Sequence, residues 1–255
     1  MPNMQSAAIQ LYTLRDLTAK DFAGTMKAVA KLGYKFVETA GYGDLKTAKA
    51  AKKAIDDAGL KASSGHFAID LLEKNIEQVI ADAQTLQIDT VVCPYIAEDR
   101  REDAKAYEGT AKVLDTAGGA LHQHGIVLAY HNHSFEFQKF GGKYGLDILW
   151  ENTQPHLVCA EIDVYWVQHG GVNPAEYVDK LGDRVRLLHL KDMAQGDDKR
   201  FAPVGTGVID FKPILAAAEK HNVRWGIVEQ DSTYGAPPLE QIKTSIENLK
   251  KWGAV

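Results

Sequence analysis

The segment LAYHNHSFEF, residues 128–137, places two imidazoles and a carboxylate, His131, His133 and Glu136, at the end of an apolar run. Such a run is typical of a buried strand, in which successive side chains point to opposite faces. His131 and His133 therefore share one face of the strand. Because imidazoles bind divalent metals and transfer protons near neutral pH, this strand end is a candidate chemical site.

Three later apolar runs end in a similar way, with two ionisable residues at alternate positions. The pairs are Glu161 with Asp163, His189 with Lys191, and Glu229 with Asp231. If these faces converge, burying the groups without partners would cost several kcal/mol each. A divalent cation bound between these groups would offset the cost of burying them. Imidazole nitrogens together with carboxylate oxygens are ligands that suit Mn²⁺, Zn²⁺, Co²⁺ or Mg²⁺. Since a single strand-end histidine is more often structural, the prediction of one metal ion depends on the convergence.

Eight strand-like runs must position these residues, and they alternate with segments of helical periodicity. The strands are predicted at 7–13, 36–41, 61–67, 90–95, 126–133, 158–166, 185–192 and 224–231. The clearest helices are predicted at 16–32, 102–124 and 238–252. Eight βα units in 255 residues are typical of an α/β fold closed into a (β/α)₈ TIM barrel, here one domain over residues 1–255. A doubly wound sheet is the alternative, but it usually has a glycine-rich first turn, and the first glycine here is Gly24.

The carboxyl ends of the strands form the active-site face of such a barrel. Glu38, at the end of the second strand, and His66, at the end of the third, are therefore expected to join the later pairs. The segment PVGTGVIDF, residues 203–211, has two explanations. Its glycine backbone could bind an anion, or it could be a tight turn before a helix capped by Asp210. The turn is favoured, so a phosphorylated substrate does not follow from this segment.

The composition limits the classes of function. Hydrophobic residues make up 45% of the chain, enough for a large core, and the formal net charge of −5 gives no bulk attraction for nucleic acid or an anionic membrane. No apolar run reaches the ~18 residues that cross a bilayer, and the first residues do not resemble a secretion signal. Cys93 and Cys159 stand in apolar runs and are predicted to be buried, reduced thiols. A cytoplasmic location is therefore expected.

A set of motifs resembles, in order and spacing, the xylose isomerase-like TIM barrels, in the branch of sugar phosphate isomerases and epimerases. The motifs are IQLYTLRD, FVETAGYGD, YHNHSFEF, EIDVYWVQHGG, LLHLKD, APVGTGVIDF and VEQD. The resemblance covers nearly the whole chain and implies one divalent metal held by residues of strands five to eight. Carried over by motif, its ligands are His131, Asp163, His189 and Glu229.

Two positions depart from the family pattern. His131 stands where the commoner pattern has a glutamate, so one member of the family's acid–base pair of two metal-bound glutamates is missing. Trp166 stands where many epimerases have a histidine, and it offers an apolar wall on which a sugar ring can stack.

The resemblance implies an isomerase or epimerase that moves a proton beside the carbonyl of a sugar or keto-sugar, phosphorylated or not, with a metal-stabilised enediolate. Glu229 is the first candidate for the base, and His131 is the second if it is not a ligand. Glu136 matches a glutamate that contacts the sugar end in related epimerases. The remaining candidates for substrate binding are Glu38, His66, His133, Trp166 and Lys191. For Lys191, an ion pair with Asp192 is the alternative.

Three other functions stay open. Lyases and dehydratases share the fold and the metal, and there His131 and His133 would form the acid–base pair. A nucleic-acid phosphodiesterase of this fold is disfavoured because the net charge is −5 and no basic stripe is present. The third is a binding protein that holds a polyol without turnover. The expected partner is thus a small sugar rather than nucleic acid or a membrane, and homo-oligomerisation stays open.

Overall fold

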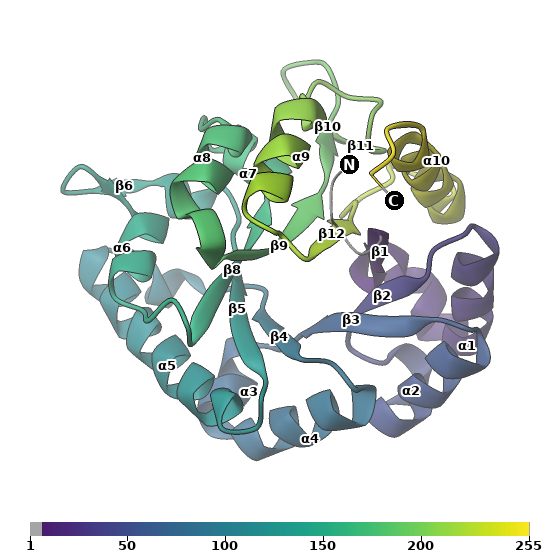
Figure 1. Cartoon of the computed structure of the whole chain (residues 1–255), viewed down its shortest axis with the longest axis horizontal. Helices are drawn as coiled ribbons and strands as arrows, with labels where there is room; N and C mark the ends of the chain where they lie inside the picture. The colour runs from purple at the N-terminus through teal and green to yellow at the C-terminus, as the bar shows by residue number, and fades with distance from the viewer. Residues whose placement is uncertain (1–6, 255) are drawn as a thin grey trace.

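Eight parallel strands form a closed barrel in the computed structural model, which describes residues 7–254 (Figure 1). The order around the barrel is β1-β12-β9-β8-β5-β4-β3-β2, and β1 also pairs with β2. The strands are β1 (Ala7–Gln10), β2 (Phe36–Ala40), β3 (Lys61–His66), β4 (Thr90–Cys93), β5 (Val127–His131), β8 (Val158–Asp163), β9 (Val185–Leu190) and β12 (Trp225–Val228). The predicted single-domain (β/α)₈ barrel is confirmed.

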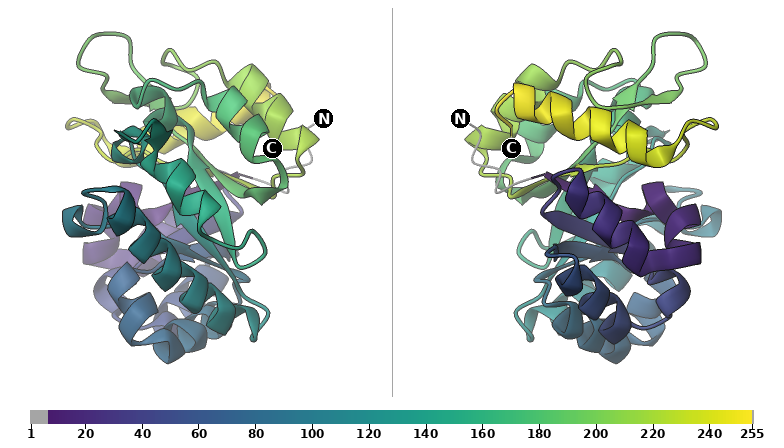
Figure 2. Two further views of the ribbon diagram at one scale, coloured as in Figure 1. Left: turned by 90° about the vertical axis from the view of Figure 1, so that its left-hand side faces the viewer. Right: turned by 90° about the vertical axis from the view of Figure 1, so that its right-hand side faces the viewer.

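Helices cover the outside of the barrel. They are α1 (Arg15–Lys31), α2 (Ala48–Asp57), α3 (Ile69–Lys74), α4 (Ile76–Leu86), α5 (Ala104–His122), α6 (Gly145–Glu151), α7 (Val164–His169), α8 (Pro174–Leu181), α9 (Phe211–Lys220) and α10 (Pro238–Lys251). The ring of helices closes where α10 lies beside α1 (Figure 2, right), and there the Tyr34 hydroxyl donates to the Ile242 carbonyl at 2.8 Å.

Short elements complete the connections. The 3₁₀ turns are η1 (Leu11–Leu14), η2 (Gly43–Leu45), η3 (Glu98–Arg100), η4 (Phe135–Phe137) and η5 (Gly182–Arg184). Two small hairpins pair β6 (Lys139–Phe140) with β7 (Lys143–Tyr144) and β10 (Asp192–Met193) with β11 (Phe201–Ala202). Within residues 7–254, no helix is long and apolar enough to span a bilayer. Cys93 and Cys159 both carry free thiols, as predicted, although Cys159 is only half-buried.

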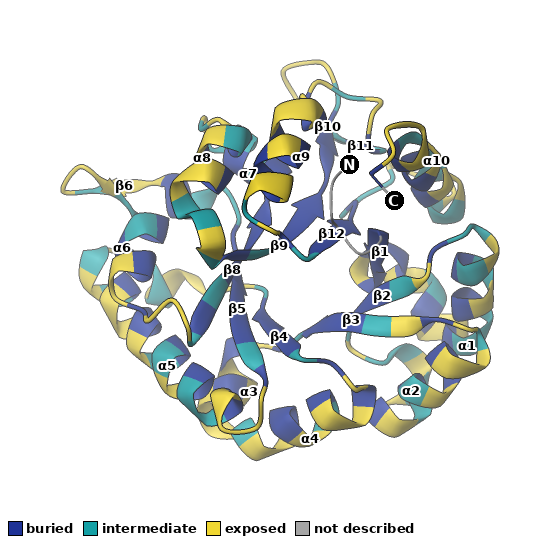
Figure 3. Cartoon of the chain, in the orientation of Figure 1, coloured by how far each residue is buried: buried dark blue, intermediate teal, exposed yellow. Residues whose placement is uncertain are grey.

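The strands are buried on both faces, while the helices bury one face and expose the other (Figure 3). A small apolar cluster packs separately from the main core and consists of Ala8, Val92, Ala129, Leu187, Trp225 and Ile227. Ala129, Leu187 and Ile227 each precede a candidate metal ligand by two residues. Because side chains alternate along a strand, this cluster lies inside the barrel, beneath the ligands, and supports them from below.

All eight strands end earlier than predicted, and side-chain caps explain two of these ends. The Gln10 side chain accepts a hydrogen bond from the Tyr12 backbone N–H, which starts η1. Asp163 accepts from the Trp166 backbone N–H at 3.0 Å and starts α7, so Trp166 lies on a helix and not on the predicted strand. Glu229 directly follows β12 instead of lying within it.

Candidate metal and active site

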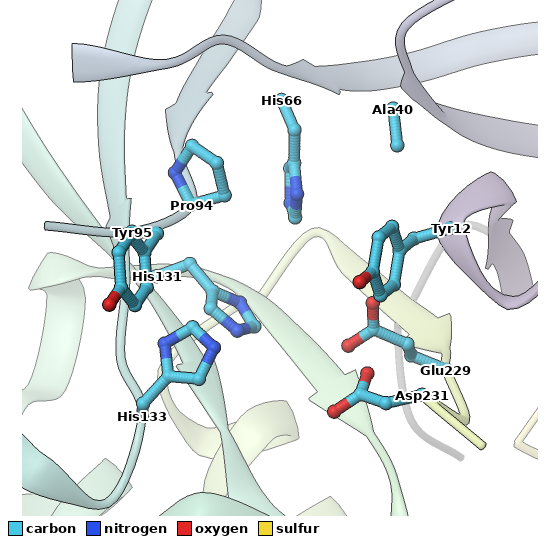
Figure 4. Close-up of a pocket in the computed structure, with 9 residues that line it drawn as sticks. All are labelled: Tyr12, Ala40, His66, Pro94, Tyr95, His131, His133, Glu229 and Asp231. Carbon is cyan, nitrogen blue, oxygen red and sulfur yellow. The ribbon is translucent and has the colours of Figure 1, made fainter. Parts of the chain in front are cut away.

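A cavity of about 430 Å³ opens at the carboxyl ends of the barrel strands (Figure 4). Four residues predicted from the sequence line it, namely His66, His131, His133 and Glu229. The other lining residues are Tyr12, Ala40, Pro94, Tyr95 and Asp231. The alternating pattern of ionisable residues at the strand ends therefore predicted part of the cavity lining. The two tyrosines of the lining, Tyr12 and Tyr95, were not predicted from the sequence.

The four candidate ligands come together at the base of this cavity. His131, Asp163, His189 and Glu229 each offer one ligand atom, and these atoms all lie within 4.8 Å of one another. His189 Nδ1 lies 2.9 Å from Glu229 Oε2, and His131 Nε2 lies 3.8 Å from Asp163 Oδ2. All four side chains are almost completely buried. The predicted convergence of strands five to eight is thus present in the geometry.

Local hydrogen bonds fix the position of Asp163. Its backbone N–H donates to Asn132 Oδ1 at 3.0 Å, which ties the end of β8 to the end of β5. Its Oδ1 accepts from the Trp166 N–H, while its buried Oδ2 lies 3.0 Å from Lys191 Nζ and 3.8 Å from His131 Nε2. Oδ2 therefore faces the other candidate ligands and is placed to bind a cation together with them.

The protonation states bear on whether a divalent ion fits. Burial, together with the nearby His189, lowers the pKa of His131 well below its usual value, which keeps the imidazole in the neutral form that binds metals. Burial alone would lower the pKa of His189, but Glu161 and Glu229 outweigh it and raise that pKa. His189 must therefore release a proton to act as a ligand. The donor set of two imidazoles and two carboxylates fits a divalent ion such as Mn²⁺, Zn²⁺, Co²⁺ or Mg²⁺.

Two carboxylates lie behind the histidines and hold their other ring nitrogens. Glu161 Oε2 lies 3.0 Å from His131 Nδ1, and Glu38 Oε1 lies 2.8 Å from His189 Nε2. Carboxylates in this position fix the orientation and tautomer of a metal-binding histidine. Glu38 was predicted to bind sugar hydroxyls, but it is fully buried and does not line the cavity. Glu161 received no role from the sequence, although its place two residues before Asp163 was a usable signal.

The Glu161→Gln variant tests this orienting role. We expect the affinity for the divalent ion to fall by about 10- to 100-fold, since the amide is a weaker acceptor for the His131 N–H. A competition titration with a chelating dye measures it, with Glu151→Gln on the exposed side of α6 as the matched control. An unchanged affinity in Glu161→Gln would show that Glu161 does not support the ligands.

Lys191 neutralises the charge of the neighbouring carboxylates and does not line the cavity. Its side chain is 1% exposed, and its Nζ lies 2.7 Å from Glu229, 3.0 Å from Asp163 and 2.9 Å from Asp231. The alternative pairing with Asp192 is wrong, because the Asp192 carboxylate binds backbone N–H groups instead. As Lys191 does not line the cavity, the structure does not support the expected contact with a substrate hydroxyl or phosphate.

The glycine segment is a turn that binds the chain's own carboxylate. The backbone N–H groups of Gly205 and Gly207 donate to Asp192 Oδ2 at 2.9 and 2.8 Å. Asp210 accepts from the Lys212 N–H and caps α9, as predicted. Since these N–H groups are already engaged, the segment offers no site for a substrate phosphate.

Glu136 and Trp166 do not line the cavity. Glu136 is fully buried and accepts from the Tyr130 hydroxyl at 2.7 Å and from the His133 backbone N–H at 2.8 Å, so it holds His133 in place instead of facing a sugar. The Trp166 ring lies 5.4 Å from the His133 ring and 5.4 Å from Lys191 Nζ. The Trp166 ring therefore packs behind His133 and Lys191, and it is not placed to stack on a sugar in the cavity as expected.

Glu136 gives the stability a dependence on pH. Burial raises its pKa from 4.5 to about 7, which corresponds to about 3 kcal/mol. Between these values the native state keeps a proton that the unfolded state has lost, so the free energy of unfolding falls as the pH rises. In Glu136→Gln the amide oxygen can accept from the His133 N–H, and the amide NH₂ can donate to the Tyr130 hydroxyl oxygen. Urea unfolding at pH 5 and pH 8 should show the variant gaining stability over the native chain at pH 8. Glu247→Gln, at an exposed position, is the control and should change the free energy of unfolding equally at both pH values. An equal change at both pH values in Glu136→Gln would contradict the role of Glu136.

Comparison with known proteins assigns the family. The family model of the xylose isomerase-like TIM barrels matches residues 26–252 of this chain. The chain belongs to the xylose isomerase-like TIM barrel family.

Within this family the chain is similar to an inosose dehydratase of Geobacillus kaustophilus, with 29% identity over 168 residues. The match covers 56% of this chain and 54% of that relative, so it spans about half the length of each. Among solved structures, a sugar phosphate isomerase/epimerase of Parabacteroides distasonis has a TM-score of 0.84 and 24% identity, covering 96% of this chain and 98% of the other. The IOLI protein with a zinc atom has a TM-score of 0.74 and 14% identity, covering 96% and 97%. The two structural likenesses show the fold.

Proposed function

We propose that this xylose isomerase-like barrel is a metal-dependent lyase that removes water from a keto-polyol or keto-sugar. The observation that carries the proposal is His133, whose ring lines the cavity and whose buried Nδ1 has no hydrogen-bond partner within residues 7–254. The similarity to an inosose dehydratase supports the same class of reaction. This was the alternative to an isomerase in the sequence-based prediction, and it now comes first.

The reaction requires a proton to leave the carbon beside a carbonyl and a hydroxyl to leave the next carbon, with formation of a C=C bond. A divalent ion held by His131, Asp163, His189 and Glu229 would polarise the carbonyl oxygen and stabilise the developing negative charge. The chain itself must supply a base for the carbon-bound proton and a proton for the leaving oxygen.

His133 suits the transfer of this proton. Burial and the nearby Lys191 ammonium lower the pKa of His133 to about 3, so the ring is neutral but a weak base, and its place in the cavity lining supports its role as the proton-transfer group. The ring is held against Phe135, with centroids 5.3 Å apart, and edge-on to Tyr95 at 5.8 Å. We infer that the ring nitrogen of His133 that faces the cavity takes the proton from carbon and returns it to the leaving hydroxyl.

Glu229 is less suited to be the first base than the sequence suggested. Burial alone would raise its pKa, but Lys191 and His189 outweigh it and lower the pKa well below the usual value. Its Oε2 already accepts from His189 Nδ1 and Lys191 Nζ, so Glu229 serves first as a ligand. His66 remains as the candidate for binding substrate hydroxyls because it lines the cavity beside the ligands.

An isomerase or epimerase is the second candidate, and one observation favours it. His133 and Glu229 lie on opposite sides of the cavity (Figure 4), as an epimerase needs if one group removes a proton and the other returns it to the opposite face. In that reaction no hydroxyl leaves.

Product analysis distinguishes the two reactions. The protein loaded with Mn²⁺, Zn²⁺, Co²⁺ or Mg²⁺ would be incubated with a keto-inositol and with a panel of aldoses and ketoses, and the products weighed by mass spectrometry. The lyase gives a product lighter by one water. A product of unchanged mass that exchanges a carbon-bound proton with solvent deuterium would replace the lyase by the isomerase.

A further inference from the structure

Two half-exposed tyrosines stand on opposite sides of the cavity mouth, Tyr12 after β1 and Tyr95 after β4 (Figure 4). Their exposed fractions are 45% and 48%. Only six large hydrophobic side chains among residues 7–254 are exposed, and two of them flank this one cavity. An apolar surface that adjoins a candidate active site is a candidate for binding part of the substrate.

Neighbouring residues hold both tyrosine rings in place although the rings face solvent. The Arg15 guanidinium lies 4.3 Å from the centre of the Tyr12 ring and donates to the backbone carbonyls of Tyr12 and Asp231. Tyr95 packs edge-on against Phe135, with ring centroids 5.7 Å apart. Rings that are already fixed lose little conformational entropy on binding, which favours their use as a binding surface.

The cavity has a polar base and an apolar rim. His66, His131, Glu229 and Asp231 line the base. Tyr12, Ala40, Pro94 and Tyr95 line the rim. A single keto-polyol carries a hydroxyl on every carbon except the carbonyl carbon, and it matches the polar base better than the apolar rim. The volume of about 430 Å³ falls in the range of roughly 300–1,000 Å³ that is typical of small-molecule sites.

We propose that the rim is a subsite for a second ring, so that the substrate is a glycoside whose sugar occupies the base and whose aglycone ring lies against Tyr12 and Tyr95. This inference rests on the proposed function for the sugar at the base. Aromatic faces at the rim bind such a ring through stacking and edge contacts.

Paired probes without a ketone test the subsite independently of any reaction. Methyl and phenyl β-D-glucopyranoside differ only in the aglycone, and neither can undergo the elimination. Ligand-observed NMR titration of the full chain should show phenyl glucoside binding at least about fivefold more tightly. The double variant Tyr12→Ala/Tyr95→Ala should lose this preference while its affinity for methyl glucoside stays unchanged. Trp252→Ala, which removes an exposed aromatic ring outside the cavity, is the matched control and should keep it.

Equal affinities for the two glucosides in the native chain would overturn the subsite, as would a preference that survives in the double variant. The single variants Tyr12→Leu and Tyr95→Leu keep apolar bulk and give the same readout if the double variant is poorly folded. A clear preference in a chain that does not release water from keto-polyols would support the subsite and reject only the lyase.

Discussion

Replacing Asp163 by asparagine should remove the metal ion and lower kcat/KM by at least about 10³-fold, since the metal contributes several kcal/mol of charge stabilisation. Asp163 Oδ2 is buried and faces the other three ligands. The amide keeps the shape and can still accept from the Trp166 N–H through Oδ1, so α7 keeps its cap. The loss is therefore expected in metal content and rate rather than in folding.

Asp210→Asn is the matched control, because Asp210 is also the N-cap of a helix but does not belong to the group of candidate ligands. Metal content per chain and the rate of water loss would be measured for both variants and for Glu229→Gln, which should resemble Asp163→Asn. One ion per chain retained in Asp163→Asn, or full activity of the native chain after exhaustive chelation, would refute the metal role.

Replacing His133 by glutamine should lower kcat by about 10²- to 10⁴-fold, the usual contribution of a general base, without changing the metal content. Glutamine preserves the hydrogen-bonding capacity of the side chain but cannot accept a proton from carbon. The Glu136 contact to the His133 backbone N–H survives, so the loop keeps its position. His124→Gln, at an exposed position after α5, controls for the loss of a histidine.

The comparison of rate with metal content separates two roles for His133. A large loss of kcat with one ion still bound identifies a proton-transfer group. An unchanged kcat would return the role of base to Glu229, and parallel loss of rate and metal would make His133 a ligand.

The fold could be predicted from the sequence because apolar runs and helical segments alternate eight times. Alternation along the strands also predicted which ionisable residues share a face, and it brought His131 and His189 to the same place as Glu229. Depth along the barrel axis was not predictable in this way. Glu38 shares a strand end with the site, yet it lies behind His189, where only the three-dimensional packing places it.

The misplaced residues have local causes that strand patterns do not encode. Trp166 turned away from the predicted strand because Asp163 caps α7. Glu136 is turned inward by the Tyr130 hydroxyl, which lies six residues earlier on β5. Tyr12 stands on the short turn η1 after β1 and Tyr95 on the loop after β4, and such short connections carry no periodicity from which an orientation can be read.

The most direct measurement is a crystal structure of the metal-loaded chain with anomalous scattering from the ion. One peak should lie ~2.0–2.2 Å from side-chain atoms of His131, Asp163, His189 and Glu229, with His131 bound through Nε2 and Glu161 holding Nδ1. A second group, His66, His131, Glu161 and His189, also brings its ligand atoms within 4.8 Å of one another. A peak in that second group, or one that His131 does not contact, would contradict the assignment of the metal site and the reaction derived from it.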